Sequence, residues 1–356
     1  MQLITEKIQS NLDISSLLKL KNEEFVIFDI ETTGLSSKTS NIYLIGYILY
    51  TDNGFELRQF FSDSYDDESN VLEAFFKDIK DKKYIISYNG NGFDIPYINN
   101  KAEFYKLNYN LSCFTSIDLY RFVIQYKSLF KLINYKQPTV EEFLKIDRKD
   151  CLSGGELIDY YKEYLKTNDV HLLKYLLLHN HDDLTGLFDL ISILKYINTF
   201  NCEFEDISIT DMDTHIIINA LLPYKLPSRL SFSNEFAYIS ISENMLKLKT
   251  DIINDTLKHF FENYKEYVYL PAEDNAIHIS VGQYVDKAYK QKACKENCYT
   301  KRNGRFIKQA QKSSQPAYGY DYSTKNVYIK LTDTFTLDKQ ALTEYVRNVI
   351  NNIKKL

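Results

Sequence analysis

The chain contains 356 residues, 44% of them hydrophobic, and its formal net charge is −5 at pH 7. This length predicts one large domain or two of ordinary size, with a sizeable core. The negative charge excludes a polycation, so any binding of nucleic acid must use a local basic surface or metal ions. The five scattered cysteines do not predict a disulfide framework, and we find neither a signal-peptide core nor an apolar segment of membrane-spanning length. We therefore expect a cytoplasmic protein.

The first part of the chain predicts a meander of strands. Residues 1–22 are expected to form a short helical lead-in. Apolar, β-rich runs follow at residues 25–31, 41–50 and 56–61, with a hairpin signal at residues 52–54. Three strands with short connections predict an antiparallel meander.

A crossover through a helix follows the meander. Residues 68–80 place apolar side chains at helical spacing, and residues 84–88 form a short buried strand that the crossover makes parallel to the first strand. Further helices are expected at residues 93–106, 115–132, 139–145, 155–166 and 168–198. This order predicts an α/β domain over residues 1–201, in which helices flank a mixed β-sheet.

The composition changes after residue 201, where we place a domain boundary. Residues 202–356 predict a smaller α+β domain, which begins with short β-rich runs separated by turn signals. Its later elements are expected to be a helix at residues 252–263, a strand at 326–331 and a helix from about residue 337. The sequence does not define the role of this domain.

A basic segment covers residues 287–312, where nine lysines or arginines occur with a single acid. Aromatic residues are interspersed, which suits phosphate contacts combined with base stacking. A solvated amphipathic helix and loop would have the same composition, and the sequence favours neither interpretation. Lys301, Arg302 and Arg305 are the candidate substrate contacts.

Two carboxylates, Asp29 and Glu31, interrupt the first buried strand. Residues i and i+2 of a strand point to the same side, so both acids leave the same face of the sheet. Neighbouring acids repel each other and need a cation or a shared proton. A divalent metal site is one interpretation, and a strand that ends in a solvated turn is the other.

Further polar residues interrupt two other buried elements. Asp94 would lie in the first turn of a helix, where an ordinary N-terminal acid is the common alternative. His179 and Asp183 are four residues apart on the long helix and share one face. A partly buried histidine with satisfied hydrogen bonds is the ordinary interpretation of His179 alone, and His181 points to another side of the helix.

Three motifs occur in order along the chain. They are Asp-x-Glu-Thr-Thr-Gly from Asp29, Tyr-Asn-Gly-x-x-Phe-Asp from Tyr88, and His-Asn-x-x-Asp from His179. Together they resemble the motifs of the DEDD superfamily of 3′–5′ exonucleases, and most closely its YprB-like branch. The resemblance covers about residues 22–195 and implies a ribonuclease H-like fold.

The resemblance also implies two divalent ions, Mg²⁺ or Mn²⁺, and a general base. The metal ligands would be Asp29, Glu31, Asp94 and Asp183. The base would be His179, although His-x-x-x-Asp has the spacing of the class that carries a tyrosine there. A base displaced by one residue, or His181 swung inward, is the competing possibility. Carboxylate oxygens suit these ions better than zinc, and two such ions can activate a water and stabilise the leaving 3′ oxygen.

The leading hypothesis is a metal-dependent 3′–5′ exonuclease. Its substrate would be DNA or RNA with a single-stranded 3′ end, and Thr32, Thr33 and Asn89 are candidate contacts to it. A nucleic-acid-binding module with a vestigial metal site and a structure-specific endonuclease are the alternatives. The sequence decides neither the kind of nucleic acid nor the oligomeric state.

Overall fold

The computed structural model describes residues 1–150, 152, 154–199, 202–311 and 313–352. Asn201, at the expected domain boundary, and Lys312, the last residue of the basic segment, lie outside this range. The chain divides into two compact units, Met1–Asn198 and Thr199–Leu356. Within the described residues, no helix is long and apolar enough to cross a membrane.

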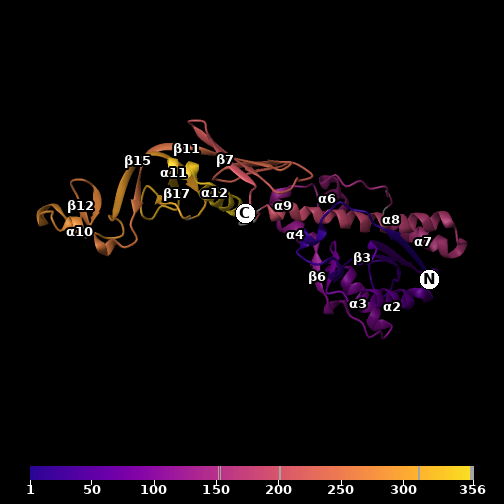
Figure 1. Ribbon diagram of the computed structural model, residues 1–356. Helices are drawn as coiled ribbons and strands as arrows, with labels where there is room; N and C mark the ends of the chain where they lie inside the picture. Colours follow the sequence, from indigo (N-terminus) through magenta and orange to yellow (C-terminus); the bar gives the residue numbers. More distant parts are fainter. Residues whose placement is uncertain (151, 153, 200–201, 312, 353–356) are drawn as a thin grey trace. The chain divides into compact units, whose positions relative to one another are not determined.

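The first unit (Figure 1) is built on a six-stranded mixed sheet, whose strands are hydrogen-bonded in the order β1-β4-β3-β2-β5-β6. The strands are β1 (Gln2–Lys7), β2 (Phe25–Thr32), β3 (Ile42–Thr51), β4 (Gly54–Phe61), β5 (Tyr84–Ser87) and β6 (Thr115–Asp118). The expected meander β2-β3-β4 is antiparallel, and β5 pairs with β2 in parallel. The fold class predicted for this part of the chain is therefore confirmed.

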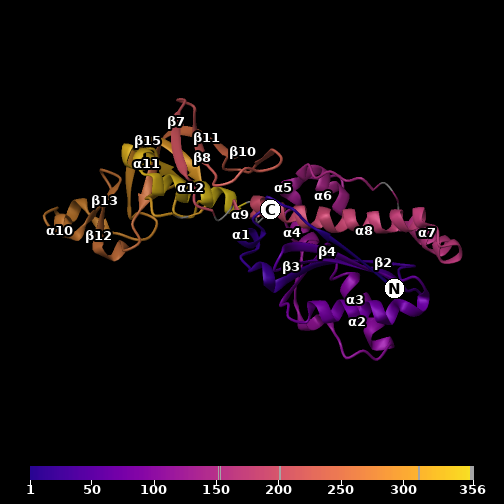
Figure 2. The same cartoon turned by 45° about the vertical axis from the view of Figure 1, so that its right-hand side comes forward.

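Helices cover both faces of this sheet (Figure 2). One face packs against α2 (Glu68–Ile79) and α3 (Asp94–Phe104), because the apolar stripes of these helices join a core with alternate residues of β2 and β3. The long helix α8 (Val170–Leu190) contacts β2 and β3. The remaining helices of this unit are α1 (Ile14–Leu18), α4 (Leu119–Gln125), α5 (Lys127–Phe130), α6 (Gln137–Leu144), α7 (Gly154–Thr167) and α9 (Leu194–Asn198).

Three local expectations are wrong. The lead-in is not only helical, because β1 precedes α1 and pairs with the edge of β4. The helix expected at residues 115–132 begins as strand β6, which extends the sheet beside β5. The helix expected at residues 252–263 is, up to Phe260, part of the strand β11 (Met245–Phe260). In each case, hydrogen bonds to a neighbouring strand distant in sequence override the local helical pattern.

The second unit contains an eight-stranded antiparallel sheet. Its strands are β7 (Asp206–Asp211), β8 (His215–Leu221), β9 (Leu230–Ser233), β10 (Tyr238–Ser242), β11 (Met245–Phe260), β15 (Tyr299–Gln309), β16 (Ala317–Tyr318) and β17 (Val327–Lys330). A smaller sheet joins β12 (Tyr267–Leu270), β13 (Asn275–His278) and β14 (Gln291–Lys292). The helices of this unit are α10 (Ile279–Gly282), α11 (Asp333–Leu337) and α12 (Lys339–Asn351).

Candidate metal centre

The site begins with Asp29 and Glu31 near the end of β2, on the face that α8 covers. The amide Nδ2 of Asn180, on α8, donates a hydrogen bond of 2.9 Å to Oδ2 of Asp29. Asn180 is fully buried, and its own Oδ1 accepts a hydrogen bond from Nε2 of Gln59 at 3.0 Å. Asn180 therefore holds the Asp29 carboxylate in one orientation.

Gly46 makes this close approach of α8 possible. It lies directly opposite Asp29 on the neighbouring strand β3. A Cβ atom at position 46 would lie 1.9 Å from Oδ1 of Asn180 and 2.6 Å from Cδ1 of Leu184. No side chain fits in that space, so only glycine lets α8 pack against the sheet at the level of Asp29.

Asp94 is the first residue of α3 and is 6% exposed. Burial raises its pKa to about 7, and the nearby carboxylates of Asp118 and Asp183 act in the same direction. The loop before α3 passes through Asn89, which has a left-handed φ of 63° and donates its backbone N–H to Asp118 at 2.8 Å. This turn allows the buried acid to begin a helix beside β2.

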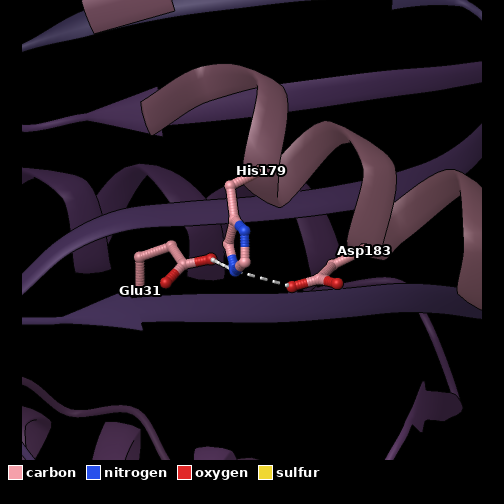
Figure 3. Close-up of side chains that lie close together, drawn as sticks. All are labelled: Glu31, His179 and Asp183. Atoms are coloured by element: carbon pink, nitrogen blue, oxygen red, sulfur yellow. Dashed lines mark ion pairs between the residues drawn. The ribbon is translucent and has the colours of Figure 1, made fainter. Parts of the chain in front are cut away.

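His179 and Asp183 leave the same side of α8 and meet Glu31 (Figure 3). Nε2 of His179 lies 3.3 Å from Oδ2 of Asp183 and 3.7 Å from Oε1 of Glu31. One potential ligand atom from each of these three residues lies within 4.8 Å of the others. The structure thus brings a histidine nitrogen and two carboxylates to one point.

The other ring nitrogen of His179 contacts an acid that the sequence analysis missed. Nδ1 lies 2.6 Å from Oδ2 of Asp150, which follows α6. Burial opposes ionisation of Asp150, but hydrogen bonds from the backbone of Leu152 and from His179 lower its pKa overall. An ionised Asp150 fixes the proton of His179 on Nδ1 and leaves Nε2 directed at Glu31 and Asp183.

Arg148 is the second residue that the sequence analysis missed. Its Nη2 lies 2.6 Å from Oδ1 of Asp183 and 3.5 Å from Oδ2 of Asp150, and its Nη1 lies 3.3 Å from Glu141. A guanidinium on three carboxylates neutralises part of their charge. The run Arg148-Lys149-Asp150 has the composition of a solvated loop, so nothing local in the sequence indicated this position.

The acids of the site repel one another. Burial raises the pKa of both Asp29 and Glu31 well above its ordinary value, and the charges of Asp183 and then Asp94 raise it further. Such a group of carboxylates binds either protons or cations near neutral pH. All four predicted ligands, Asp29, Glu31, Asp94 and Asp183, therefore share one electrostatic environment.

A cavity of about 850 Å³ opens beside His179 and Asp183. It is also lined by the predicted contact Asn89, by Arg148 and Asp150, and by three tyrosines, Tyr88, Tyr120 and Tyr135. A volume of this order accommodates a nucleotide-sized ligand. The cavity thus combines tyrosines with His179, Arg148 and the acids Asp150 and Asp183.

The hydroxyl groups of Thr32 and Thr33, the two threonines predicted to contact the substrate, form hydrogen bonds with the protein backbone. Oγ1 of Thr32 donates to the carbonyl of Gly34 at 2.9 Å, and Oγ1 of Thr33 accepts from the backbone N–H of Asn41 at 2.9 Å. These bonds shape the loop between β2 and β3. His181, the competing base, is directed elsewhere, because its Nε2 lies 3.2 Å from Glu6.

The three predicted basic contacts belong to the second unit. Lys301 forms an ion pair with Asp274. Arg305 forms a bidentate ion pair with Asp211, in which Nη1 lies 2.5 Å from Oδ2 and Nη2 lies 2.6 Å from Oδ1. The guanidinium of Arg302 donates to a backbone carbonyl at 3.3 Å. The segment that contains them forms strands β14 and β15 and not an amphipathic helix. Of the eight basic residues of the segment that the structure describes, three are paired with acids: Lys301, Arg305 and Lys308.

Comparison with known proteins supports the fold of the first unit. Residues 26–195 match the family model of the RNase_H superfamily. With the mixed sheet and its flanking helices, this match identifies an RNase H-like domain. No curated protein sequence matches the chain.

A solved structure that the chain resembles is the family B DNA polymerase from the hyperthermophilic archaeon Pyrobaculum calidifontis, with 15% sequence identity and a TM-score of 0.40. The similarity covers 68% of this chain and 35% of the polymerase chain, so the chain spans about a third of that protein's length.

Proposed function

We propose that this protein is a metal-dependent nuclease that hydrolyses phosphodiester bonds, as a 3′–5′ exonuclease of the DEDD type. The main observation that supports this proposal is that Asp29, Glu31, Asp94 and Asp183 converge beside His179 in an RNase H-like domain. A core that only had to be stable would not gather four mutually repelling acids.

The residues present fit divalent ions. The ligands would be Asp29, Glu31, Asp94 and Asp183, and their oxygen atoms suit Mg²⁺ or Mn²⁺. Burial and then the charges of Asp183 and Asp94 raise the pKa of both Asp29 and Glu31, which is the environment that a bound cation would stabilise. When bound, a pair of such ions supplies Lewis-acid activation of water and stabilisation of the leaving oxygen.

Side chains of the protein itself would supply the base and the contacts to the substrate. Nε2 of His179 accepts the proton of the attacking water, and the Asp150 carboxylate stabilises the resulting imidazolium through Nδ1. Arg148, at the edge of the cavity, offers a positive charge to the phosphate. Tyr88 and Tyr120 provide ring surface for the terminal nucleotide.

An isosteric change tests the metal ligand. We expect Asp29→Asn to lower Mg²⁺- or Mn²⁺-dependent hydrolysis of a single-stranded oligonucleotide by at least about 100-fold. Glu6→Gln is the matched control, because the Glu6 carboxylate lies 3.2 Å from the outward-facing His181. Equal activity of wild type and Asp29→Asn would contradict the proposal.

The polarity of cleavage is tested separately. A 5′-labelled oligonucleotide digested over time should shorten stepwise from its 3′ end. Early discrete internal cuts would instead assign the same chemistry to a structure-specific endonuclease.

One observation favours the alternative of a binding module with a vestigial site. Arg148 already contacts Asp183, so that part of the acidic charge is balanced without an ion. The two functions differ in one measurement. Titration with Mn²⁺ gives saturable binding that Asp29→Asn weakens if the site is a metal centre, and no such binding if it is vestigial.

A further inference from the structure

The second unit contains a five-stranded antiparallel arrangement, β9-β10-β11-β8-β7, of which Figure 2 labels β7, β8, β10 and β11. Alternate residues of these strands, such as Ile218, Ile239 and Leu248, are buried. Helix α12 packs in the same unit, contacts β7 and β15, and buries its own apolar stripe. The intervening side chains of the strands therefore point to the opposite, exposed face.

The strand register places a defined set of side chains on that face. Lys247, on the central strand β11, lies between Asn219 and Ser240. Two residues further along the same strand, Lys249 lies beside Tyr238. Directly opposed side chains of an antiparallel pair lie close enough to act on one ligand, so each lysine has a polar or aromatic neighbour.

The positive charge of this face is available to a ligand. Lys247, Lys249 and Arg229 are exposed, and within the part of the chain that the structure describes none of them has an ion-pair partner. Lys301 and Arg305 of the basic segment, in contrast, are held by Asp274 and Asp211. Uncompensated positive charge therefore occurs outside the basic segment as well, on this sheet face.

Two shallow hollows flank the lysines. One, of about 420 Å³, is lined by Arg229, Ser240 and Lys247, and the other, of about 530 Å³, includes Tyr238 and Lys249. Tyr238 is 45% exposed, which leaves ring surface for a ligand. Cations, hydroxyl groups and an exposed ring are the combination that binds single-stranded nucleic acid, by contacts to phosphates and by stacking on bases.

Acidic residues lie at the two ends of this face. Glu243, in the turn between β10 and β11, lies 3.6 Å from Lys225 and is thereby partly neutralised. Asp251 lies two residues beyond Lys249 and opposite His215. The cationic part of the face is therefore a limited patch around Lys247 and Lys249, of a size that suits a few nucleotides.

We propose that this sheet face binds single-stranded nucleic acid, with Lys247, Lys249 and Arg229 contacting phosphates and Tyr238 stacking on a base. The inference rests on the proposed function in that the bound strand would be the nuclease substrate. Binding itself requires no metal ion and no hydrolysis.

The test measures binding of the full chain to a fluorescently labelled single-stranded oligonucleotide in EDTA, which prevents metal-dependent cleavage. We expect Lys247→Gln/Lys249→Gln to raise Kd about 10-fold near 0.1 M salt, and to make the dependence of log Kd on log salt concentration shallower by about 1.4. Lys292→Gln/Lys295→Gln is the matched control, because it removes the same charge from exposed positions of the basic segment. It should leave Kd within about twofold.

The stacking contact has its own pair of variants. Tyr238→Ala should weaken binding about 5-fold or more, while Tyr238→Phe keeps the ring and should bind like the wild type. Tyr289→Ala removes an exposed tyrosine of the basic segment and serves as the control. A duplex of the same sequence should bind more weakly than the single strand and should not respond to Tyr238→Ala.

Several results would overturn the proposal. These are unchanged binding by the Lys247/Lys249 variant, equal losses in the two lysine pairs, or a duplex bound as tightly as the single strand. The failure of the proposed function is recognised independently. If the wild type shows no metal-dependent hydrolysis but the Lys247/Lys249 variant still loses binding, the proposed binding surface is supported and the nuclease proposal is contradicted.

Discussion

At the scale of single residues, the distinctive feature of the site is the chain of contacts from Asp150 through His179 to Glu31 and Asp183. His179 alone could be an ordinary partly buried histidine. Its Nδ1 contact of 2.6 Å with Asp150 is what orients Nε2 toward the acids. Carboxylates that hold the far side of an imidazole typically contribute about 10- to 100-fold to the function of the site.

Replacement of Asp150 tests this orientation. We expect Asp150→Asn to lower hydrolysis about 10- to 100-fold, chiefly in kcat, because the amide no longer stabilises the imidazolium. Mn²⁺ affinity should change little, since Asp150 is not a proposed ligand. Asp147→Asn, at an exposed neighbouring position, should behave like the wild type in steady-state kinetics. A loss confined to Mn²⁺ affinity would contradict the role of Asp150.

A second residue-scale prediction concerns Asp94 and pH. Burial raises the pKa of Asp94 from its ordinary value of 3.8 to about 7 in the folded protein. The folded protein therefore binds this proton more tightly than the unfolded chain does. The corresponding contribution to the free energy of unfolding is present at low pH and is lost as pH rises from about 4 through about 7.

The substitution Asp94→Asn should remove this pH-dependent loss of the free energy of unfolding. At pH 8 in EDTA, we expect the variant to be more stable than the wild type by at least about 1 kcal/mol in urea unfolding, and the difference should shrink at pH 4.5. Mg²⁺ should stabilise the wild type more than the variant, because a proposed ligand has been removed. A variant less stable than the wild type at pH 8 in EDTA would refute this account.

At the scale of elements, the site depends on how closely α8 approaches the sheet. Gly46 on β3 leaves room for Asn180, and Gly186 on α8 leaves room for Glu141 of α6, since a Cβ there would lie 2.1 Å from Oε1 of that acid. Both glycines lie in regular elements, where glycine weakens the local structure. These glycines instead contribute by allowing close contacts between elements, of α8 with β3 and of α6 with α8.

Gly46→Ala tests the packing of α8. We expect a loss of about 1–3 kcal/mol in the free energy of unfolding, together with a clear loss of hydrolysis, because the added methyl displaces Asn180 from Asp29. Gly155→Ala is the control, since a Cβ at that helical position meets open space. Thermal unfolding and steady-state kinetics of both variants provide the measurement. Full activity of Gly46→Ala would show that Asn180 does not position Asp29.

The elements also show where local patterns mislead. Residues 252–263 have a pattern that suits a helix, yet residues up to Phe260 continue strand β11 and pair with β15. The edge strand β1 is likewise stabilised by its pairing with β4. Both partners are distant in sequence, so no local window contains the interaction that decides the structure.

At the scale of the whole molecule, the two units divide the proposed tasks. The acids and His179 belong to Met1–Asn198, and the exposed cationic sheet face belongs to Thr199–Leu356. Each unit has its own buried core. The chemistry should therefore be separable from the extended contact with the strand.

A chain restricted to residues 1–198 tests this division. We expect it to hydrolyse a dinucleotide with nearly unchanged kcat, whereas its KM for a long single strand should rise about 10-fold or more, because the second binding surface is missing. Circular dichroism establishes that the shortened chain is folded. Equal KM values for the long strand in both chains would argue against a substrate-binding role of the second unit.

The sequence by itself determined the central features of the first unit. Alternation in β2 placed Asp29 and Glu31 on one face, and helical spacing placed His179 beside Asp183, because both patterns follow from local backbone geometry. The fold of this unit follows similarly from the order of its strands and helices.

Only the tertiary structure decided the rest. It joined Asp150 and Arg148 to the site, although their own segment has no distinctive pattern. It also paired Lys301, Arg305 and Lys308 of the basic segment with acids and left Lys247 and Lys249 without an acidic partner among the described residues. Electrostatic interactions depend on distances between atoms, and those distances arise only when segments far apart in the sequence come together.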